Sequence, residues 1–121
     1  MLVNHACDGD GSIEFPARFS GFDGVAYGGY AAGRIAELVT VGRAGGVSVS
    51  FRSPPPVGQP LRYSRNDDRV SVWSCDILVA EASAWSDAPD LPSPPSLAEA
   101  IEAEARFPGH RHHAFPRCFG C

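Results

Sequence analysis

The 121-residue sequence contains no lysine, no long apolar run and no excess of positive charge. Its ten basic residues are all arginine, and fourteen acidic residues leave a net charge of −4 at pH 7. A chain of this charge lacks the basic surface that binds nucleic acid, so we expect no nucleic-acid partner. No segment approaches the roughly 20 apolar residues that span a bilayer, so we expect no membrane association.

The sequence also lacks the features of a secreted, disulfide-linked domain. Residues 1–8 do not show the charged-then-apolar order of a signal peptide, which predicts a cytoplasmic location. Four cysteines in a chain without such a signal do not predict a disulfide framework. A length of 121 residues suits a single domain with a proper core.

Alternation of apolar and polar residues predicts strands in much of the first 85 positions. The pattern is clear over residues 12–19, although Pro16 favours an edge position or a break in the ladder. Further strands are predicted over residues 47–52, 61–65, 70–74 and 77–85. Turn residues separate them at 66–68, and a hairpin is expected around Cys75 and Asp76. One face of the last strand carries small side chains, typical of a strand that packs closely against a helix: Leu78, Ala80, Ala82 and Ala84.

A glycine-rich turn at residues 21–24 leads into a predicted helix over about residues 26–41. Apolar residues recur there at helical spacing, and few positions are charged. Gly28, Gly29 and Gly33 each lower helix stability by about 1 kcal/mol relative to alanine. We therefore expect these glycines to allow the close approach of another backbone or of a ligand.

The last third of the chain differs from the rest in composition and predicted structure. Residues 86–96 are too rich in proline for regular structure and predict a linker. A short helix is predicted over residues 97–106, with Ser96 as its N-cap and Glu99 completing a capping box. A tail containing histidine and cysteine follows. We therefore divide the chain into a domain at 1–86 and a linker, helix and tail at 87–121.

Three motifs in this order resemble the hotdog-fold acyl-CoA thioesterases. The segment Phe22–Tyr30 resembles the G-x-x-H-G-G sequence at the start of their central helix. The segment Val49–Leu61 is similar to their second strand and P-x-x-x-G-x-P-L corner, and Ile77–Ala84 to one of their last strands. The resemblance implies an α+β hotdog fold, in which an antiparallel sheet wraps around one long central helix.

The same resemblance implies a function and an assembly. Hotdog thioesterases form homodimers or larger homo-oligomers and bind an acyl thioester beside the start of the helix. By that resemblance we expect an acyl-CoA-binding protein that hydrolyses the thioester, needing no cofactor beyond the coenzyme A of its substrate. The alternative is a non-catalytic acyl-binding or structural hotdog module, such as one half of a double-hotdog protein.

The resemblance assigns the candidate site residues by their positions in the matching thioesterase motifs. Gly28 and Gly29 match the glycine pair whose amides polarise the thioester carbonyl, and Tyr27 stands in place of the histidine. The helical carboxylate of the family falls on Ala36, so Glu37, one residue further, or Asp23 in the turn becomes the candidate base. Tyr30 is a further substrate-binding candidate, and Arg52 is placed to meet a phosphate of coenzyme A.

Each of these residues also has a plain structural interpretation. Arg34 and Glu37, at i and i+3, are placed for a local ion pair. Asp23 suits a turn that accepts backbone hydrogen bonds. Tyr27 and Tyr30 are typical of core aromatic residues with a hydrogen-bonded hydroxyl. Arg52 fits a solvated strand position.

The tail allows two further interpretations. We expect no metal site, and the alternative is a zinc site in which imidazole and thiolate ligands come from His112, His113, Cys118 and Cys121. The sequence F-P-x-C-F-x-C also resembles the segment that leads into a second hotdog domain in longer proteins. The chain would then be a first half whose chemistry is located in its partner domain.

Overall fold

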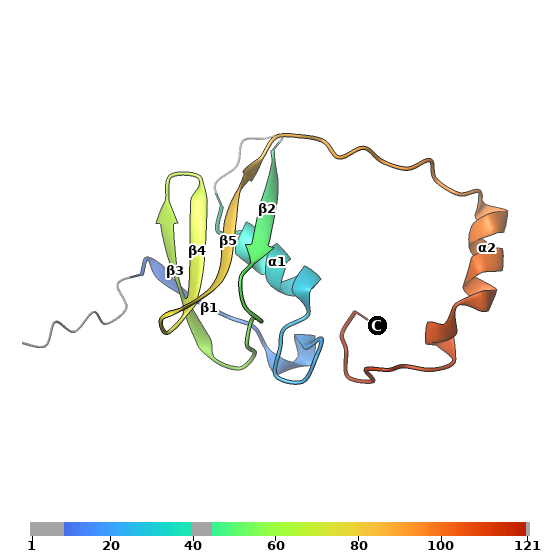
Figure 1. Cartoon of the computed structure of the whole chain (residues 1–121), viewed down its shortest axis with the longest axis horizontal. Coiled ribbons are helices and arrows are strands. Elements are labelled where there is room, and N and C mark those ends of the chain that lie inside the picture. The colour runs from blue at the N-terminus through green and yellow to red at the C-terminus, as the bar shows by residue number, and fades with distance from the viewer. Residues whose placement is uncertain (1–8, 40–44, 121) are drawn as a thin grey trace, which may run out of the picture.

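The computed structural model describes residues 9–39 and 45–120. Its five strands are β1 (Gly11–Glu14), β2 (Gly46–Phe51), β3 (Pro60–Asn66), β4 (Arg69–Ser74) and β5 (Ile77–Trp85). They form one antiparallel sheet in the order β1-β3-β4-β5-β2 (Figure 1). The two α-helices are α1 (Gly28–Ala36) and α2 (Leu97–Arg106), and short 3₁₀ turns occupy Ala17–Phe19 and Pro108–His110.

The turn predicted at residues 66–68 and the hairpin predicted around Cys75 and Asp76 are confirmed. β3 and β4 join through a turn in which Asp67 adopts a positive φ of 55°, and β4 and β5 join through Cys75 with a φ of 51°. A register shift between Val72 and Trp73 bends the β4–β5 ladder, and Val79 on the partner strand is only 1% exposed. β5 has the bounds that its alternation predicts. Ala80 and Ala82 of its predicted small-residue face are buried in the core, whereas Ala84 is exposed.

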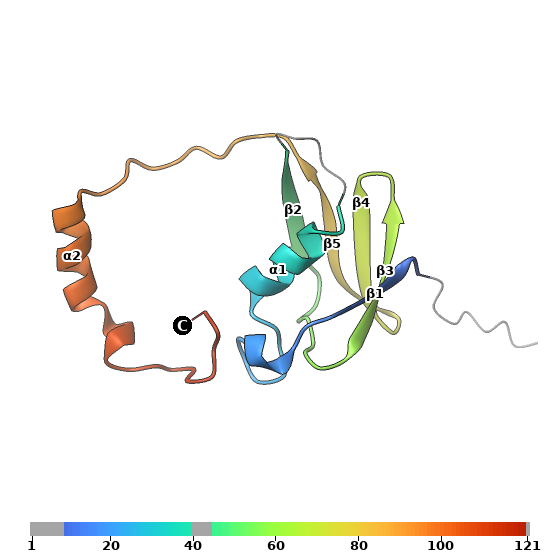
Figure 2. The same ribbon diagram turned by 180° about the vertical axis from the view of Figure 1, so that it is seen from behind.

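The core lies between α1 and one face of the sheet. Ala31 and Ile35 of α1 are fully buried, and Ala80 and Ala82 of β5 lie in the same buried cluster. Figure 2 shows α1 lying across β2 and β5, the strands that it contacts. The largest fully buried side chains are Phe15, Ile35, Leu61, Val70, Val72 and Val79.

The hotdog fold predicted from the resemblance is wrong. α1 has nine residues, about 13 Å at 1.5 Å per residue, and the sheet lies on one side of it. The chain leaves the helix through tightened turns, in which the amides of Leu38 and Val39 donate to the carbonyls of Ile35 and Ala36, three residues back. A helix this short can cover only two or three strands at about 4.8 Å spacing, so the sheet has no long helix to enclose. The part of the predicted helix beyond Val39 lies outside the described residues.

The strand predicted over residues 12–19 is also shorter than expected. β1 ends at Glu14, and residues 17–19 form a 3₁₀ turn. Pro16 lacks the amide that a ladder needs, which explains the early end. Ile13 and Phe15 are nonetheless buried as their pattern predicts, whereas Ala17, beyond the end of the strand, is exposed.

The last third of the chain extends away from the sheet. Residues 86–96 form no helix or strand, and every residue of α2 is exposed (Figure 1). α2 has the predicted bounds and capping box, because the Ser96 hydroxyl accepts from the Glu99 amide and the Glu99 carboxylate accepts from the Ser96 amide. The side-chain and then the backbone hydrogen bonds of Ser96 lower the pKa of Glu99. No described helix has the length and apolar character needed to cross a membrane.

Truncation of a buried side chain should show that packing between the sheet and α1 provides most of the free energy of folding. We expect Leu61→Ala to lower the free energy of unfolding by about 2–5 kcal/mol, because Leu61 is fully buried and its removal leaves a cavity. Leu97→Ala is the matched control, since Leu97 is 76% exposed on α2, and it should change stability by about 0.5 kcal/mol or less. Urea denaturation followed by tryptophan fluorescence measures both, and equal losses would contradict this assignment of the core.

Candidate functional site

The glycine-rich turn is fixed against neighbouring segments on two sides. The Ala26 amide donates to the Pro55 carbonyl (2.8 Å), and the Tyr27 amide donates to the Phe19 carbonyl (2.7 Å). Gly24 has a positive φ of 76°, which glycine adopts at little cost. These bonds place the start of α1 at one edge of the core, beside the loop that contains Pro55.

The C-terminal tail returns to this turn and packs against it. The Phe119 amide donates to the Ser20 carbonyl at 2.7 Å. The Phe119 ring lies edge-on to Phe19 at 4.9 Å and near Tyr27 at 5.9 Å, and Phe115 lies edge-on to Phe22 at 4.8 Å. Such aromatic pairs contribute about 0.5–1.5 kcal/mol each. The tail therefore forms an aromatic wall in front of the start of α1.

An apolar cavity of about 470 Å³ lies between the turn and the tail. This volume lies within the range of ligand pockets in proteins, about 300–1,000 Å³. None of the side chains that line it carries a carboxylate or a guanidinium group. The lining residues are Gly21, Phe22, Val25, Ala26, Tyr27, Gly28, Pro55, Phe115 and Cys118.

The start of α1 borders this cavity at Gly28. The first amide that donates within the helix is that of Ala31, to the Tyr27 carbonyl at 3.0 Å. The amides of Gly28, Gly29 and Tyr30 donate to no group among the described residues. Gly28 lines the cavity, and its amide is the one that a bound carbonyl can approach.

Close backbone packing does not explain the glycines of α1. A Cβ built on Gly28 would have one neighbour, a Phe51 ring carbon at 4.0 Å, and one built on Gly33 would have none within 4 Å. At Gly29 a Cβ would lie 3.0 Å from the Tyr27 ring, which is a side chain. The expectation of a close backbone neighbour is therefore wrong, and Gly28 faces space that a ligand can enter.

Asp23 lies near the apolar cavity without lining it. Its side chain lines an adjoining cavity of about 370 Å³ that also contains Arg117. The two cavities share Gly21, Phe22 and Phe115. Asp23 is exposed, so water reaches its carboxylate.

Glu37 lies at the opposite end of α1 from the cavity. It is the C-cap residue, and its carboxylate lies 3.4 Å from the Arg34 guanidinium with 70% of the side chain exposed. The predicted i, i+3 ion pair is confirmed. Because nine residues of helix separate Glu37 from Gly28, the two lie about 13 Å apart along the axis.

Tyr30 packs in an aromatic cluster beside the site. Its ring stacks on Phe19 at 4.0 Å and lies edge-on to Phe15 at 6.4 Å. Its hydroxyl accepts a hydrogen bond from Arg34 at 3.1 Å, which raises the pKa of Arg34 with further help from Glu37. The interpretation of Tyr30 as a hydrogen-bonded core aromatic is confirmed.

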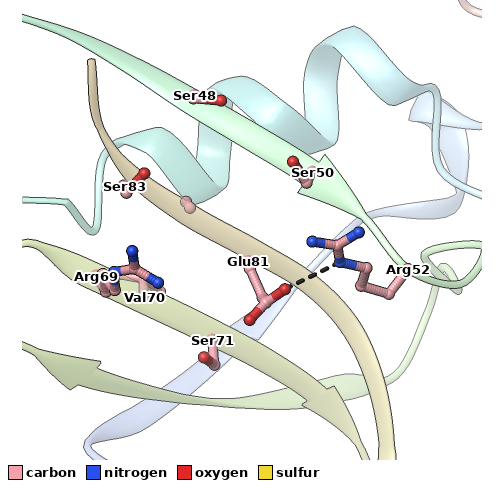
Figure 3. A pocket seen from close by; sticks show the side chains of 9 residues that line it. Ser48, Ser50, Arg52, Arg69, Val70, Ser71, Glu81 and Ser83 are labelled. Atoms are coloured by element: carbon pink, nitrogen blue, oxygen red, sulfur yellow. Dashed lines mark hydrogen bonds and ion pairs between the residues drawn. The ribbon is translucent and has the colours of Figure 1, made fainter. Parts of the chain in front are cut away.

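Arg52 is separated from the apolar cavity by the sheet. Its Nε lies 2.9 Å from the Glu81 carboxylate, on the face of the sheet opposite α1 (Figure 3). Both side chains are about half exposed. Arg52 and the start of α1 therefore belong to two different surfaces.

The tail brings no metal-binding cluster together among the described residues. Within that part of the chain, no group of three or more histidine, cysteine or acidic side chains is placed to hold a metal ion. His112 and His113 are exposed, and Cys118 lines the apolar cavity. Cys121, the fourth ligand in the zinc alternative, lies outside the described residues.

Sequence reasoning did not identify Phe115, Phe119 and Pro55 as parts of this site. They lie far from Tyr27 in sequence, and only the return of the tail and the turn of the proline loop bring them close. The repeated phenylalanines of the tail were the available signal, since exposed aromatic residues at a chain end often mark a contact.

Removal of one tail aromatic should release the tail without unfolding the sheet. We expect Phe119→Ala to accelerate tryptic cleavage after Arg117 several-fold, because Phe119 contacts three rings of the body: Phe19, Tyr27 and Tyr30. Cleavage after Arg111, which lies before the docked segment, provides an internal reference and should not change. Equal acceleration at both sites, or at neither, would contradict docking through Phe119.

Comparison of the chain with protein-family models, with curated proteins and with solved structures finds no match. The resemblance to thioesterases is thus supported by no relative. What the chain does must be inferred from the chemistry of its own residues.

Proposed function

We propose that this chain binds an acyl group in the apolar cavity beside the start of α1. The observation that carries the proposal is the lining of that cavity, which is formed by apolar side chains and backbone and includes no charged group. An acyl chain gains free energy by leaving water for such a surface, at about 25 cal/mol per Å² of apolar area buried. The cavity is partly open to solvent, so a ligand can enter it.

The backbone of α1 supplies a polar contact for the carbonyl end of the ligand. A thioester or carboxyl carbonyl needs hydrogen-bond donors once it leaves water. The Gly28 amide has no partner among the described residues and lies at the cavity. Apolar side chains and a single backbone donor together favour an acyl thioester over a free sugar or a nucleotide.

A bulky side chain placed in the cavity should abolish acyl binding. Val25→Trp adds an indole to the lining, and we expect it to weaken the binding of decanoyl-CoA at least tenfold in isothermal titration. Ile77→Trp is the matched control, because Ile77 is 61% exposed at the start of β5 and does not line the cavity. Its affinity should equal that of the unchanged protein, and free coenzyme A should bind much more weakly than the acyl form.

A pair of glycine substitutions tests the contact with the helix start. Gly28→Ala and Gly33→Ala should each stabilise the fold, by roughly 0.5–1 kcal/mol for a helix interior and less at the first helical position. Only Gly28→Ala should weaken acyl binding, since Gly33 does not line the cavity. Equal affinities for the two variants would contradict a contact at Gly28.

Hydrolysis of the bound thioester is a second candidate function, favoured by the position of Asp23. Its carboxylate lies in the adjoining cavity that shares Phe22 and Phe115 with the acyl site. As a general base it would take a proton from water, whose oxygen attacks the carbonyl carbon. The C–S bond then breaks, and the leaving thiolate takes the proton back from Asp23, which yields a carboxylic acid and a free thiol. The Gly28 amide would stabilise the developing oxyanion.

Turnover of decanoyl-CoA, followed by release of free thiol, distinguishes the two candidates. If the protein hydrolyses thioesters, Asp23→Asn should lower kcat at least tenfold and leave acyl binding intact. Glu37→Gln should leave kcat unchanged, because Glu37 lies at the far end of α1. Binding without turnover would identify a non-catalytic acyl-binding protein.

A further inference from the structure

The face of the sheet opposite α1 carries a second cavity of a different chemistry. Its volume is about 140 Å³, and it lies over β2, β4 and β5 (Figure 3). The side chains around it are four serines, two arginines and one glutamate: Ser48, Ser50, Ser71, Ser83, Arg52, Arg69 and Glu81. Two guanidinium groups and one carboxylate leave the cavity with an excess of positive charge.

The cross-strand register explains why these side chains gather. Ser50 pairs with Glu81, which pairs with Ser71 on the other side, so one row crosses three strands. The next row contains Ser48, Ser83 and Arg69. Alternate residues of a strand point to the same face, so both rows point away from α1.

Arg69 is the cation of this cavity that has no partner. Its guanidinium makes no hydrogen bond or ion pair with any described residue, whereas Arg52 holds the Glu81 carboxylate at 2.9 Å. Arg69 and Glu81 are diagonal neighbours across β4 and β5, about 7–8 Å apart in such a ladder. Because Arg52 pairs with Glu81, the Arg69 guanidinium is left open to a ligand.

The serine hydroxyls add donors around that guanidinium. None of the four hydroxyls donates to another described group. A phosphate monoester has three terminal oxygens, of which a guanidinium binds two in a forked pair. The third oxygen can accept from a hydroxyl such as that of Ser71 or Ser83.

We propose that this cavity binds the phosphate group of a small organic phosphate through Arg69 and the surrounding serines. Its volume of about 140 Å³ is well below the roughly 300–1,000 Å³ of pockets that enclose a whole ligand, so it suits the phosphate group and not a large organic group. The organic part then extends over the open sheet face, where the remaining serines and the Arg52–Glu81 pair offer contacts. This site is independent of the acyl cavity, because the sheet separates them.

An NMR titration at low salt tests the proposal. Glucose 6-phosphate should shift the backbone amides of Arg69, Ser71 and Ser83 in ¹⁵N–¹H spectra, and leave those of Tyr27 and Gly28 unchanged. Inorganic phosphate should shift the same amides, and glucose should not. Equal shifts with glucose, or no shifts with either phosphate, would overturn the proposal.

Three variants distinguish a specific phosphate site from nonspecific electrostatic attraction. Arg69→Gln should weaken the binding of glucose 6-phosphate at least tenfold. Glu81→Gln should tighten it two- to five-fold, because it removes a repelling carboxylate and frees Arg52. Arg111→Gln removes an exposed arginine far from the cavity and should have no effect. Equal losses in Arg69→Gln and Arg111→Gln, or no gain in Glu81→Gln, would contradict a site at Arg69.

Discussion

The packing of α1 on the alanine face of β5 is the contact on which the rest of the structure depends. Ala31 and Ile35 are fully buried in the same cluster as Ala80 and Ala82, and small side chains on both elements let helix and strand approach closely. This contact defines which face of the sheet is the core. It thereby separates the apolar cavity from the polar one.

The start of α1 borders the apolar cavity. A helix that begins at Gly28 leaves its first amides at the edge of the sheet, where no carbonyl among the described residues accepts from them. The proline loop closes one side of that edge, and the aromatic residues of the tail close another. The residues between the sheet and the tail make no contribution to the core, since those of the linker and α2 are exposed.

The face of the sheet opposite α1 carries the polar residues of the same alternating strands. Ser48, Ser50 and Ser83 alternate with core-facing residues, so the strand pattern that builds the core also builds a hydroxyl-rich surface. The ion pair of Arg52 with Glu81 sets the electrostatics of that surface. One sheet thus offers an apolar site at the edge of one face and a cationic site on the other.

The sequence by itself determined the local structure of this protein. Alternation predicted β5 with its observed bounds, and Ser96 with Glu99 predicted the start of α2. The turn at residues 66–68 and the hairpin around Cys75 were also predicted from their residues. These features depend on residues close together in the chain, where helix propensity, strand propensity and capping decide the structure.

The length of α1 could not be predicted in this way. The periodic apolar pattern continues past Ala36, whereas the chain itself tightens into a turn there. Only the tertiary structure decided that no long helix is enclosed, that Phe115 and Phe119 meet the glycine-rich turn, and that Arg69 has no partner among the described residues. Each of these outcomes depends on contacts between segments that are distant in sequence. A local pattern of residues does not show which of these segments meet.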